Sequence, residues 1–505
     1  MSIPLQRALE REVLKLIARH NSKCRDAAHD RQRYHRRSGR PASLPSSTIP
    51  GHWKAHRHFN PYYVRSRLPN ITRALGAHLR DGSYRPTPIL LAEIPKPHGG
   101  TREISLLTVP DAAVSYALGT RLITRNAHFF TSYTYAYRRD RNAHHAIQHL
   151  MSTIRGCSRL FVLEFDFSKY FDSIGHEYLL QVLTQHFLVS KREEDLVRTL
   201  LLAPRAHGVA DYLAGRFDTP TRGIPQGSTL SLFLANVACH ELDRQLENAG
   251  ATFARYADDT LVVCDSYDKA DLCARAILDH GKRSGTQVNV TKSAGISLLT
   301  GQGAAEMKSK HSIEFLAHSL SADGVGLSTS SIRRIKRKLS QLIHMHLLLQ
   351  PTRGSIDRAR IGVGFVDWDL VTCVNELRRY IYGRLSDAEV RSALAGTGRF
   401  NVTRSALSFF PTVDLGKADT LKAMDGWLVD VLVRAYRKRV RLLHTLGIEV
   451  RTIDKDELLA GTWYSFPPVP FEPQIPSLYR SWLYVRRCAQ IFGLERFPSP
   501  VYEYM

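Results

Sequence analysis

The chain is 505 residues long, and its 43% hydrophobic and 23% charged residues are the composition of a folded protein with several domains. Its 70 Lys and Arg against 47 Asp and Glu give a net charge of +23 and a sequence pI near 9.8, which indicates a polyanionic partner, usually nucleic acid. A basic surface can also meet a membrane, but no apolar run reaches the roughly 18 residues that span a bilayer. The N-terminal residues lack the apolar core of a signal peptide, so we expect a cytoplasmic protein without membrane contact.

Residues 1 to about 60 begin with apolar residues at helical spacing and then become strongly basic. Tyr34 and His35 lie among these charges, and arginines mixed with aromatic residues are typical of RNA contact. A solvated helix face is the alternative, and we favour RNA contact. The arginines concerned are Arg31, Arg33, Arg36 and Arg37.

Two apolar runs between residues 85 and 110 flank the segment Lys96-Pro-His-Gly-Gly-Thr-Arg102, which predicts a hairpin with a basic tip. Paired cations at such a tip suit the oxygens of a triphosphate, so Lys96 and Arg102 are candidate nucleotide contacts. An ordinary solvent-facing turn is the alternative. The basic and aromatic residues 133–147 have the composition that binds a single nucleic-acid strand by stacking and charge.

The run Tyr256-Ala-Asp-Asp259 has apolar residues on both sides, which predicts a hairpin whose turn lifts Asp258 and Asp259 out of two buried strands. Buried charge without a partner is costly, so these carboxylates need a cation. An acidic turn between two ordinary strands is the alternative.

A second acidic centre lies at the end of the apolar run Leu160–Phe165, where a short turn leads from Asp166 into the next helix. A carboxylate at a strand end can face a cleft, and Phe171 lies where its ring can wall that cleft. Asp166 alone could merely cap the following turn. Together with Asp258, a metal site with two carboxylates is the better interpretation.

Between the two acidic centres, Gly223-Ile-Pro-Gln-Gly-Ser228 opens a predicted helix. Glycines next to a helix N-terminus leave the backbone accessible, which suits close approach by a nucleotide or a template base. A plain loop-to-helix junction is the alternative, since Gly, Pro and Ser favour such junctions.

These motifs, in this order and followed by Thr-Lys292-Ser and Glu314-Phe-Leu, resemble the palm of bacterial reverse transcriptases of the group II intron-like branch. The resemblance covers roughly residues 85–345 and implies an α+β fold: a right-hand polymerase with fingers, a palm with an antiparallel sheet, and a thumb, followed by a mainly α-helical C-terminal domain. We expect an N-terminal extension at 1–60, fingers at 61–158, palm with parts of the fingers at 159–328, the start of the thumb at 329–350, and the helical thumb and C-terminal domain at 351–505.

The resemblance also implies roles for single residues. Asp166 and Asp258 would hold two Mg²⁺ ions with help from Asp259, and Lys292 would protonate the pyrophosphate. Phe171 would exclude ribonucleotides, while Gln226 and Gly227 would contact the template and the incoming nucleotide. Carboxylate oxygens are suitable ligands for Mg²⁺. Two such ions can lower the pKa of a primer 3′-hydroxyl and stabilise the pentacoordinate phosphorus that forms when it attacks.

Residues 350–505 indicate a helical and basic region, without the Cys pairs or His-Asn-His arrangement of a homing endonuclease or the spaced acidic residues of an RNase H. The chain therefore resembles the stand-alone reverse transcriptases of the so-called unknown groups, many of them linked to defence against phage. We expect an RNA-directed DNA polymerase that makes cDNA from dNTPs with an associated noncoding RNA. A retron-type or intron-derived enzyme, an RNA-binding protein with a decayed core, and a homo-oligomer stay open.

A template-independent or protein-primed polymerase of the same fold is a further alternative. Tyr502 and Tyr504 end the chain after two prolines, and a phenolic hydroxyl could replace the primer hydroxyl as the nucleophile. The favoured interpretation of these tyrosines is that they dock the C-terminus on the helical domain.

Overall fold

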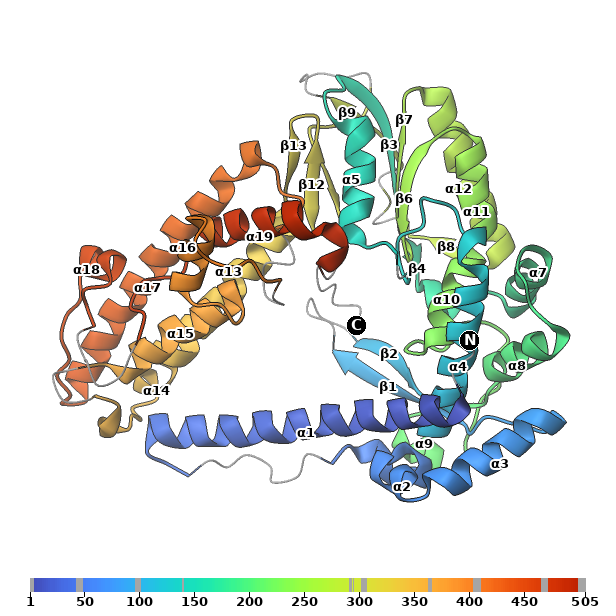
Figure 1. The fold of residues 1–505 in the computed structure, drawn as a ribbon, viewed down its shortest axis with the longest axis horizontal. Coiled ribbons are helices and arrows are strands. Elements are labelled where there is room, and N and C mark those ends of the chain that lie inside the picture. The colour runs from blue at the N-terminus through green and yellow to red at the C-terminus, as the bar shows by residue number, and fades with distance from the viewer. Residues whose placement is uncertain are drawn as a thin grey trace. The chain divides into compact units, whose positions relative to one another are not determined.

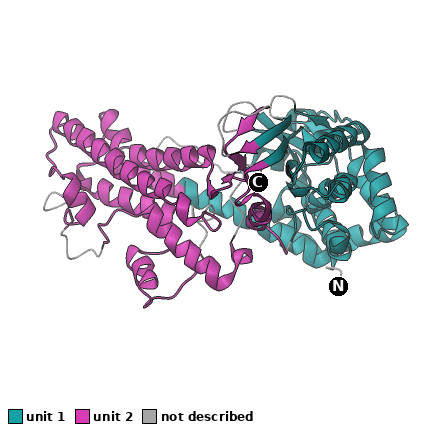
Figure 2. Ribbon diagram, turned by 90° about the horizontal axis from the view of Figure 1, so that it is seen from above, with its two compact units in different colours: residues 1–27, 45–139, 160–298 teal, residues 28–44, 140–159, 299–505 magenta. Residues whose placement is uncertain are grey.

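The structure is a computed structural model that describes residues 4–41, 49–95, 101–138, 140–289, 293, 295–300, 307–361, 366–402, 410–464 and 471–497. The chain forms two compact units, each assembled from three separate segments (Figure 2). Unit 1 consists of Met1–Ala27, Pro45–Arg139 and Leu160–Leu298. Unit 2 consists of Ala28–Leu44, Asp140–Arg159 and Leu299–Met505.

The main sheet of unit 1 carries its strands in the order β9-β3-β7-β6 (Figure 1). The strands are β3 (Arg159–Phe165), β6 (Thr252–Tyr256), β7 (Asp259–Cys264) and β9 (Gly295–Thr300). β3 pairs antiparallel with β7, and β7 pairs antiparallel with β6, so the predicted hairpin is confirmed. Valine, leucine and phenylalanine dominate these strands, as β propensity favours, and are buried.

Helices cover this sheet. α12 (Tyr267–Ser284) packs on β7, and α4 (Val109–Asn126) packs on α10 (Thr229–Ala238). The two helices of this pair approach closely at Gly119, where a Cβ atom would lie 2.7 Å from the backbone nitrogen of Leu230. The remaining helices of unit 1 are α2 (Pro61–Ser66), α3 (Leu68–Asp81), α6 (Tyr170–Ser173), α7 (His176–His186), α8 (Lys191–Leu201), α9 (Val209–Leu213) and α11 (His240–Asn248), with 3-10 turns η1 (Gly51–Lys54), η2 (Arg57–Phe59) and η3 (Ala127–Phe129).

Two smaller sheets complete unit 1. β1 (Ile89–Pro95) pairs antiparallel with β2 (Thr101–Leu106), which confirms the hairpin predicted around residues 96–102, and parallel with β5 (Arg205–His207). β4 (Phe167–Ser168) pairs antiparallel with β8 (Gln287–Val288), directly after Asp166.

Unit 2 is mainly helical, with one antiparallel sheet of three strands in the order β11-β12-β13. Its hydrophobic core joins α13, α15, α17 and α19, with Leu339, Leu377, Leu432 and Trp482 fully buried. α13 is an amphipathic, strongly basic helix: its apolar residues face this core and its arginines and lysines do not. The bounds are β10 (Ser309–Lys310), β11 (Ile313–Phe315), β12 (His318–Ser321), β13 (Gly324–Leu327), α5 (Ala143–Ile154), α13 (Thr329–Ile343), η4 (His344–Leu348), α14 (Leu349–Thr352), η5 (Arg358–Arg360), α15 (Trp368–Tyr382), α16 (Asp387–Leu394), η8 (Leu415–Lys417), α17 (Asp419–Thr445), α18 (Lys455–Ala460), α19 (Leu478–Phe492) and η9 (Leu494–Arg496).

The N-terminal residues form one 34-residue helix, α1 (Leu5–Ser38), so the basic segment continues the helix that the apolar spacing predicts. Its first half packs through Leu9 and Val13 against Val64 and Val109 of unit 1, while its last residues belong to unit 2. None of the described helices combines the length and the apolar character that crossing a bilayer requires. The two compact units do not follow the predicted boundaries of N-terminal extension, fingers, palm and thumb, because each unit combines separate segments of the chain. Those boundaries therefore stay a proposal.

Candidate active site

The turn between β6 and β7 presents two carboxylates at the end of the main sheet. Tyr256 pairs with Asp259, which leaves Ala257 and Asp258 as a two-residue loop. Ala257 has φ 62°, in the left-handed region where glycine is the usual residue of such a loop. Asp258 is half-buried and Asp259 is exposed, so both carboxylates are accessible at this edge.

Asp166 lies at the same edge of the sheet, on the neighbouring strand. β3 ends at Phe165 opposite Thr260 of β7, so one further step of this register sets Asp166 beside Asp259. Its backbone carbonyl accepts the Asn289 N–H at 2.8 Å, and its carboxylate accepts the Asn289 side-chain amide at 3.4 Å. The sheet therefore places the three aspartates that the sequence indicates at one edge.

These three carboxylates have the ligand chemistry that a divalent cation requires. The described residues contain no group of three or more His, Cys, Asp or Glu side chains close enough to hold an ion by themselves. Mg²⁺ in nucleotide-transferring sites is usually held by one or two carboxylates, with substrate phosphate oxygens and water in the other positions. The arrangement fits a cation that substrate helps to bind.

The loop before α10 is held against the segment that follows Asp166. The Gly223 and Ile224 amides donate to the carbonyls of Ile174 at 2.8 Å and Phe171 at 2.6 Å. Gly223 has φ +84°, and a Cβ atom there would lie 2.8 Å from the carbonyl oxygen of Asp172. Only glycine fits this contact without displacing backbone, which explains the first residue of the motif.

Gln226 links this loop to the β1–β2 hairpin. Its side-chain oxygen accepts from Arg102 Nε at 3.0 Å and Nη2 at 2.7 Å, and its amide donates to the Asp172 carboxylate at 3.0 Å. Gly227 is exposed, with φ +114°. Arg102, Gln226 and Asp172 thus form a continuous polar chain, and Asp172 is a member of it that the sequence did not single out for a role.

Phe171 is 9% exposed and meets Tyr170 edge to face, with ring centroids 5.7 Å apart. Lys169, two residues earlier, has φ 46°. A strained backbone of this kind fixes the direction in which the following residues leave the strand. Phe171 is thus a firmly held, largely buried ring next to the loop that contains Gln226.

Sequence reasoning missed a buried ion pair beneath the turn. Arg255 of β6 and Asp243 of α11 are 0% and 1% exposed, and Arg255 Nε lies 2.7 Å from Asp243 Oδ1. Burial lowers the pKa of the Arg255 guanidinium, but the charge of Asp243 outweighs this and raises the pKa above its ordinary value. The available signal was an arginine inside an otherwise apolar strand, which requires a buried partner.

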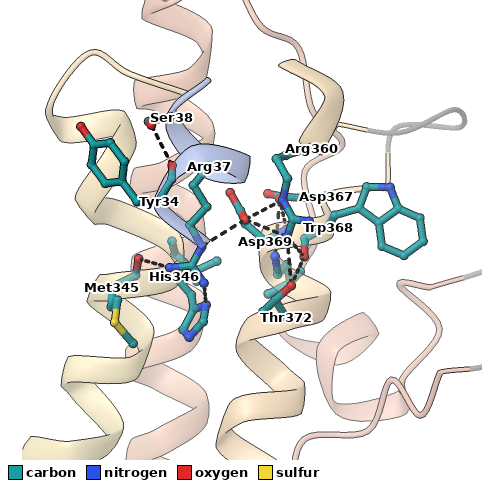
Figure 3. Close-up of polar contacts among 12 residues, drawn as sticks. Tyr34, Arg37, Ser38, Met345, His346, Arg360, Asp367, Trp368, Asp369 and Thr372 are labelled. Carbon is teal, nitrogen blue, oxygen red and sulfur yellow. Dashed lines mark hydrogen bonds and ion pairs between the residues drawn. The ribbon is translucent and has the colours of Figure 1, made fainter. Parts of the chain in front are cut away.

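The N-terminal arginines differ in their surroundings. Arg36 is exposed, Arg31 is half-buried, and Arg33 is 36% exposed, with Asp30 at 3.7 Å. Arg37 is buried in unit 2: it donates to the Met345 carbonyl at 3.1 Å, contacts His346, and lies 3.8 Å from Asp369 (Figure 3).

Arg37 therefore has structural partners of its own, and burial together with neighbouring arginines lowers its pKa to about 10 despite the nearby carboxylate of Asp369. Of the predicted RNA contacts, only Arg31, Arg33 and Arg36 have side chains that reach solvent. Lys96, Lys292, Tyr502 and Tyr504 lie outside the described residues.

Residues 94–320 match the family model described as reverse transcriptase (RNA-dependent DNA polymerase). Protein YkfC of Escherichia coli strain K12 is 27% identical over 190 residues, which is 37% of this chain and 48% of YkfC. The group II intron-encoded protein LtrA of Lactococcus lactis subsp. cremoris is 28% identical over 168 residues, 33% of this chain and 26% of LtrA.

A solved telomerase from Candida albicans, in complex with a fragment of telomeric RNA, aligns with 77% of this chain and 66% of its own at 12% identity. The TM-score of this alignment is 0.39. The chain spans about half the length of YkfC and less of LtrA, so these matches concern the core and not the whole proteins.

The motif order, the paired strands that hold the aspartates and the family match agree with one another. The expected α+β fold, a right-hand polymerase core followed by a mainly helical C-terminal region, is confirmed. Residues 94–320 of this chain are a reverse transcriptase domain, related to those of group II intron-encoded proteins.

Proposed function

We propose that the protein is an RNA-directed DNA polymerase, a nucleotidyltransferase that makes cDNA from dNTPs on an RNA template. The observation that carries this proposal is the convergence of Asp166, Asp258 and Asp259 at one sheet edge inside the reverse transcriptase domain. The net charge of +23 supports binding of nucleic acid, because lysines and arginines replace the counterions of the phosphates.

In this proposal Asp166 and Asp258, assisted by Asp259, hold two Mg²⁺ ions. The ions would lower the pKa of the primer 3′-hydroxyl and neutralise charge on the phosphates during transfer. Asn289 orients the Asp166 carboxylate through its amide.

The surrounding residues would bind and select the nucleotide. Arg102, with Lys96, binds the triphosphate, since the guanidinium fork matches phosphate oxygens. Gln226 and Gly227 contact the template base and the nucleotide, and Phe171 blocks the space that a 2′-hydroxyl would need. Lys292 donates the proton to pyrophosphate.

We further propose a cytoplasmic enzyme that works with a noncoding RNA in defence against phage. Its support is the resemblance of the motifs to stand-alone reverse transcriptases of that kind. Plaque counts on cells with the wild-type protein and with an Asp258→Ala variant test it, and equal protection by both would reject a role for DNA synthesis in defence.

The polymerase proposal is tested with Asp258→Ala and Asp166→Ala, assayed on poly(rA) primed with oligo(dT) and supplied with dTTP and Mg²⁺. We expect both to lose synthesis and to unfold at the wild-type temperature or slightly above it, because each removes repulsion between neighbouring carboxylates. Asp195→Ala, which removes a 58% exposed carboxylate on α8, is the matched control and should synthesise normally. Residual synthesis within about tenfold of wild type, a loss of only 1.4 kcal/mol in transition-state stabilisation, would reject the metal assignment.

A further inference from the structure

The ion pair beneath the turn is part of a larger buried network. Arg255 Nη2 lies 2.5 Å from Asp243 Oδ2, in addition to the contact between Nε and Oδ1, so the guanidinium grips this carboxylate with two nitrogens. Its Nη1 donates to the side-chain oxygen of Asn236 at 3.1 Å. These three N–H groups thus have fixed partners on α10 and α11, and of the two that remain, the one on Nη2 donates to the Thr134 hydroxyl at 3.4 Å.

The second N–H of Nη1 points to the turn itself. Arg255 Nη1 also donates to the carbonyl oxygen of Ala257 at 3.1 Å, and this carbonyl belongs to the peptide group that joins Ala257 to Asp258. Ala257 holds the left-handed φ of 62°, which costs an alanine about 1–2 kcal/mol relative to its preferred conformation. The hydrogen bond from Arg255 favours this strained turn and fixes the plane of the peptide from which Asp258 projects.

A second segment, from far away in the chain, pairs with the backbone of residue 255 and with the side-chain partners of Arg255. The Arg255 N–H donates to the Tyr133 carbonyl, and the Tyr135 N–H donates to the Arg255 carbonyl, both at 2.9 Å. Thr134 donates its hydroxyl to Asp243 at 2.8 Å, and Asn236 donates its amide to the Ala136 carbonyl at 2.9 Å.

Directly after this anchored segment, Tyr137 has φ 61°, a left-handed conformation that is rare for an aromatic residue. Strained residues of this kind persist where the surrounding structure holds them and gather at functional sites. Ala257 and Tyr137 are the two strained residues on either side of the Arg255 network.

We propose that Arg255 is a positioning residue of the active site: through Asp243 and Asn236 it holds the Ala257–Asp258 turn and the Thr134–Tyr137 segment in one fixed arrangement. This inference rests on the proposed function, because the arrangement matters only if Asp258 binds a metal ion. The consequence is that loss of the arginine fork weakens metal binding at a site that Arg255 does not itself touch, as outer partners of metal ligands do elsewhere.

The rival explanation is that the ion pair only stabilises the fold. Arg439 of α17 supplies a matched comparison in unit 2. It is 0% exposed, its Nε lies 2.6 Å from Asp367 Oδ2, its Nη2 lies 3.0 Å from Asp369 Oδ2, and its Nη1 donates to the Leu347 carbonyl at 3.0 Å. A purely structural role predicts the same consequences at both arginines.

The test uses Arg255→Lys and Arg439→Lys in the full chain. Lysine keeps the charge but has no fork, so it cannot hold a carboxylate, a side-chain amide and a carbonyl in fixed directions. Binding of Mn²⁺ to the protein is measured by the loss of the electron paramagnetic resonance signal of the free ion, and stability by urea unfolding without metal. We expect both variants to unfold at lower urea, and only Arg255→Lys to bind Mn²⁺ about tenfold more weakly.

Two results overturn the proposal: Mn²⁺ affinity within about twofold of wild type in folded Arg255→Lys, or equal weakening in both lysine variants. If Arg255→Lys does not fold, Asn236→Ala takes its place, since it removes both the partner of Arg255 Nη1 and the link to Ala136 and keeps the ion pair with Asp243. Unchanged Mn²⁺ binding in that variant overturns the proposal as well. The variant Asp258→Ala distinguishes failure of this proposal from failure of the proposed metal site. Wild-type Mn²⁺ affinity in that variant would reject the metal site at the carboxylates itself.

Discussion

Replacing Gly223 by alanine tests the close contact between the loop before α10 and the segment after Asp166. At φ +84° an alanine costs about 1–2 kcal/mol. Its Cβ would also lie 2.8 Å from the Asp172 carbonyl oxygen, so the backbone must shift either at residue 223 or at Asp172. That shift strains the hydrogen bonds from the Gly223 and Ile224 amides, each worth about 1 kcal/mol. We expect Gly223→Ala to lower the free energy of unfolding by about 3 kcal/mol.

Gly215→Ala is the matched control, because Gly215 has φ +68° and nothing lies within 4 Å of its Cβ position. Only the backbone cost of about 1 kcal/mol should remain there. Urea unfolding gives both free energies, and single-nucleotide extension gives the KM for dTTP. This KM should rise in Gly223→Ala alone, because the displaced loop carries Gln226. Equal unfolding free energies for the two variants would refute the steric reasoning.

Three further outcomes are expected. Phe171→Ala should reduce the preference for dTTP over UTP by about tenfold or more in extension assays, because it opens space at the sugar; unchanged preference would mean that another residue excludes ribonucleotides. The double variant Arg33→Gln, Arg36→Gln should bind structured RNA more weakly and lower the slope of log affinity against log salt concentration by up to about two. An unaltered slope would mean that these two arginines face solvent and do not contact RNA. Burial and the charge of Arg37 lower the pKa of His346 from 6.5 to about 3. Between these two pH values the unfolded chain binds a proton at this histidine and the folded protein does not. Stability should therefore fall by about 2 kcal/mol between pH 6.5 and pH 5 through this residue, and His346→Gln should remove that part of the loss in urea unfolding at the two pH values.

Local patterns were enough to predict the features that depend on neighbours in sequence. The hairpin around Asp258 follows from apolar flanks and a short turn, and the first part of α1 follows from apolar residues at helical spacing. The relation of Asp166 to Asp259 follows only once the register of β3 with β7 is known, since a strand pattern does not specify its partner.

The features that the sequence did not reveal depend on partners far along the chain. Thr134 and Arg255 are 121 residues apart, and no pattern in either segment predicts that the two residues are in contact. Arg37 stands in the same basic run as Arg36, and helical phase alone does not say which of the two meets a carboxylate. Tertiary contacts decide that Arg37 is buried beside Asp369 while its neighbour reaches solvent.

The assembly of each unit from three segments has a consequence for biosynthesis (Figure 2). Unit 1 is complete once Leu298 has left the ribosome, but Arg37 must then wait for His346 and Asp369, some 300 residues behind it. At roughly 5–20 residues per second, residues 299–369 take on the order of 4–14 seconds to appear. During that interval the end of α1 has no partners from the last segment of unit 2. Nascent chains stalled before residue 369 should therefore be cleaved by protease near residues 28–41, and chains that contain all 505 residues should resist.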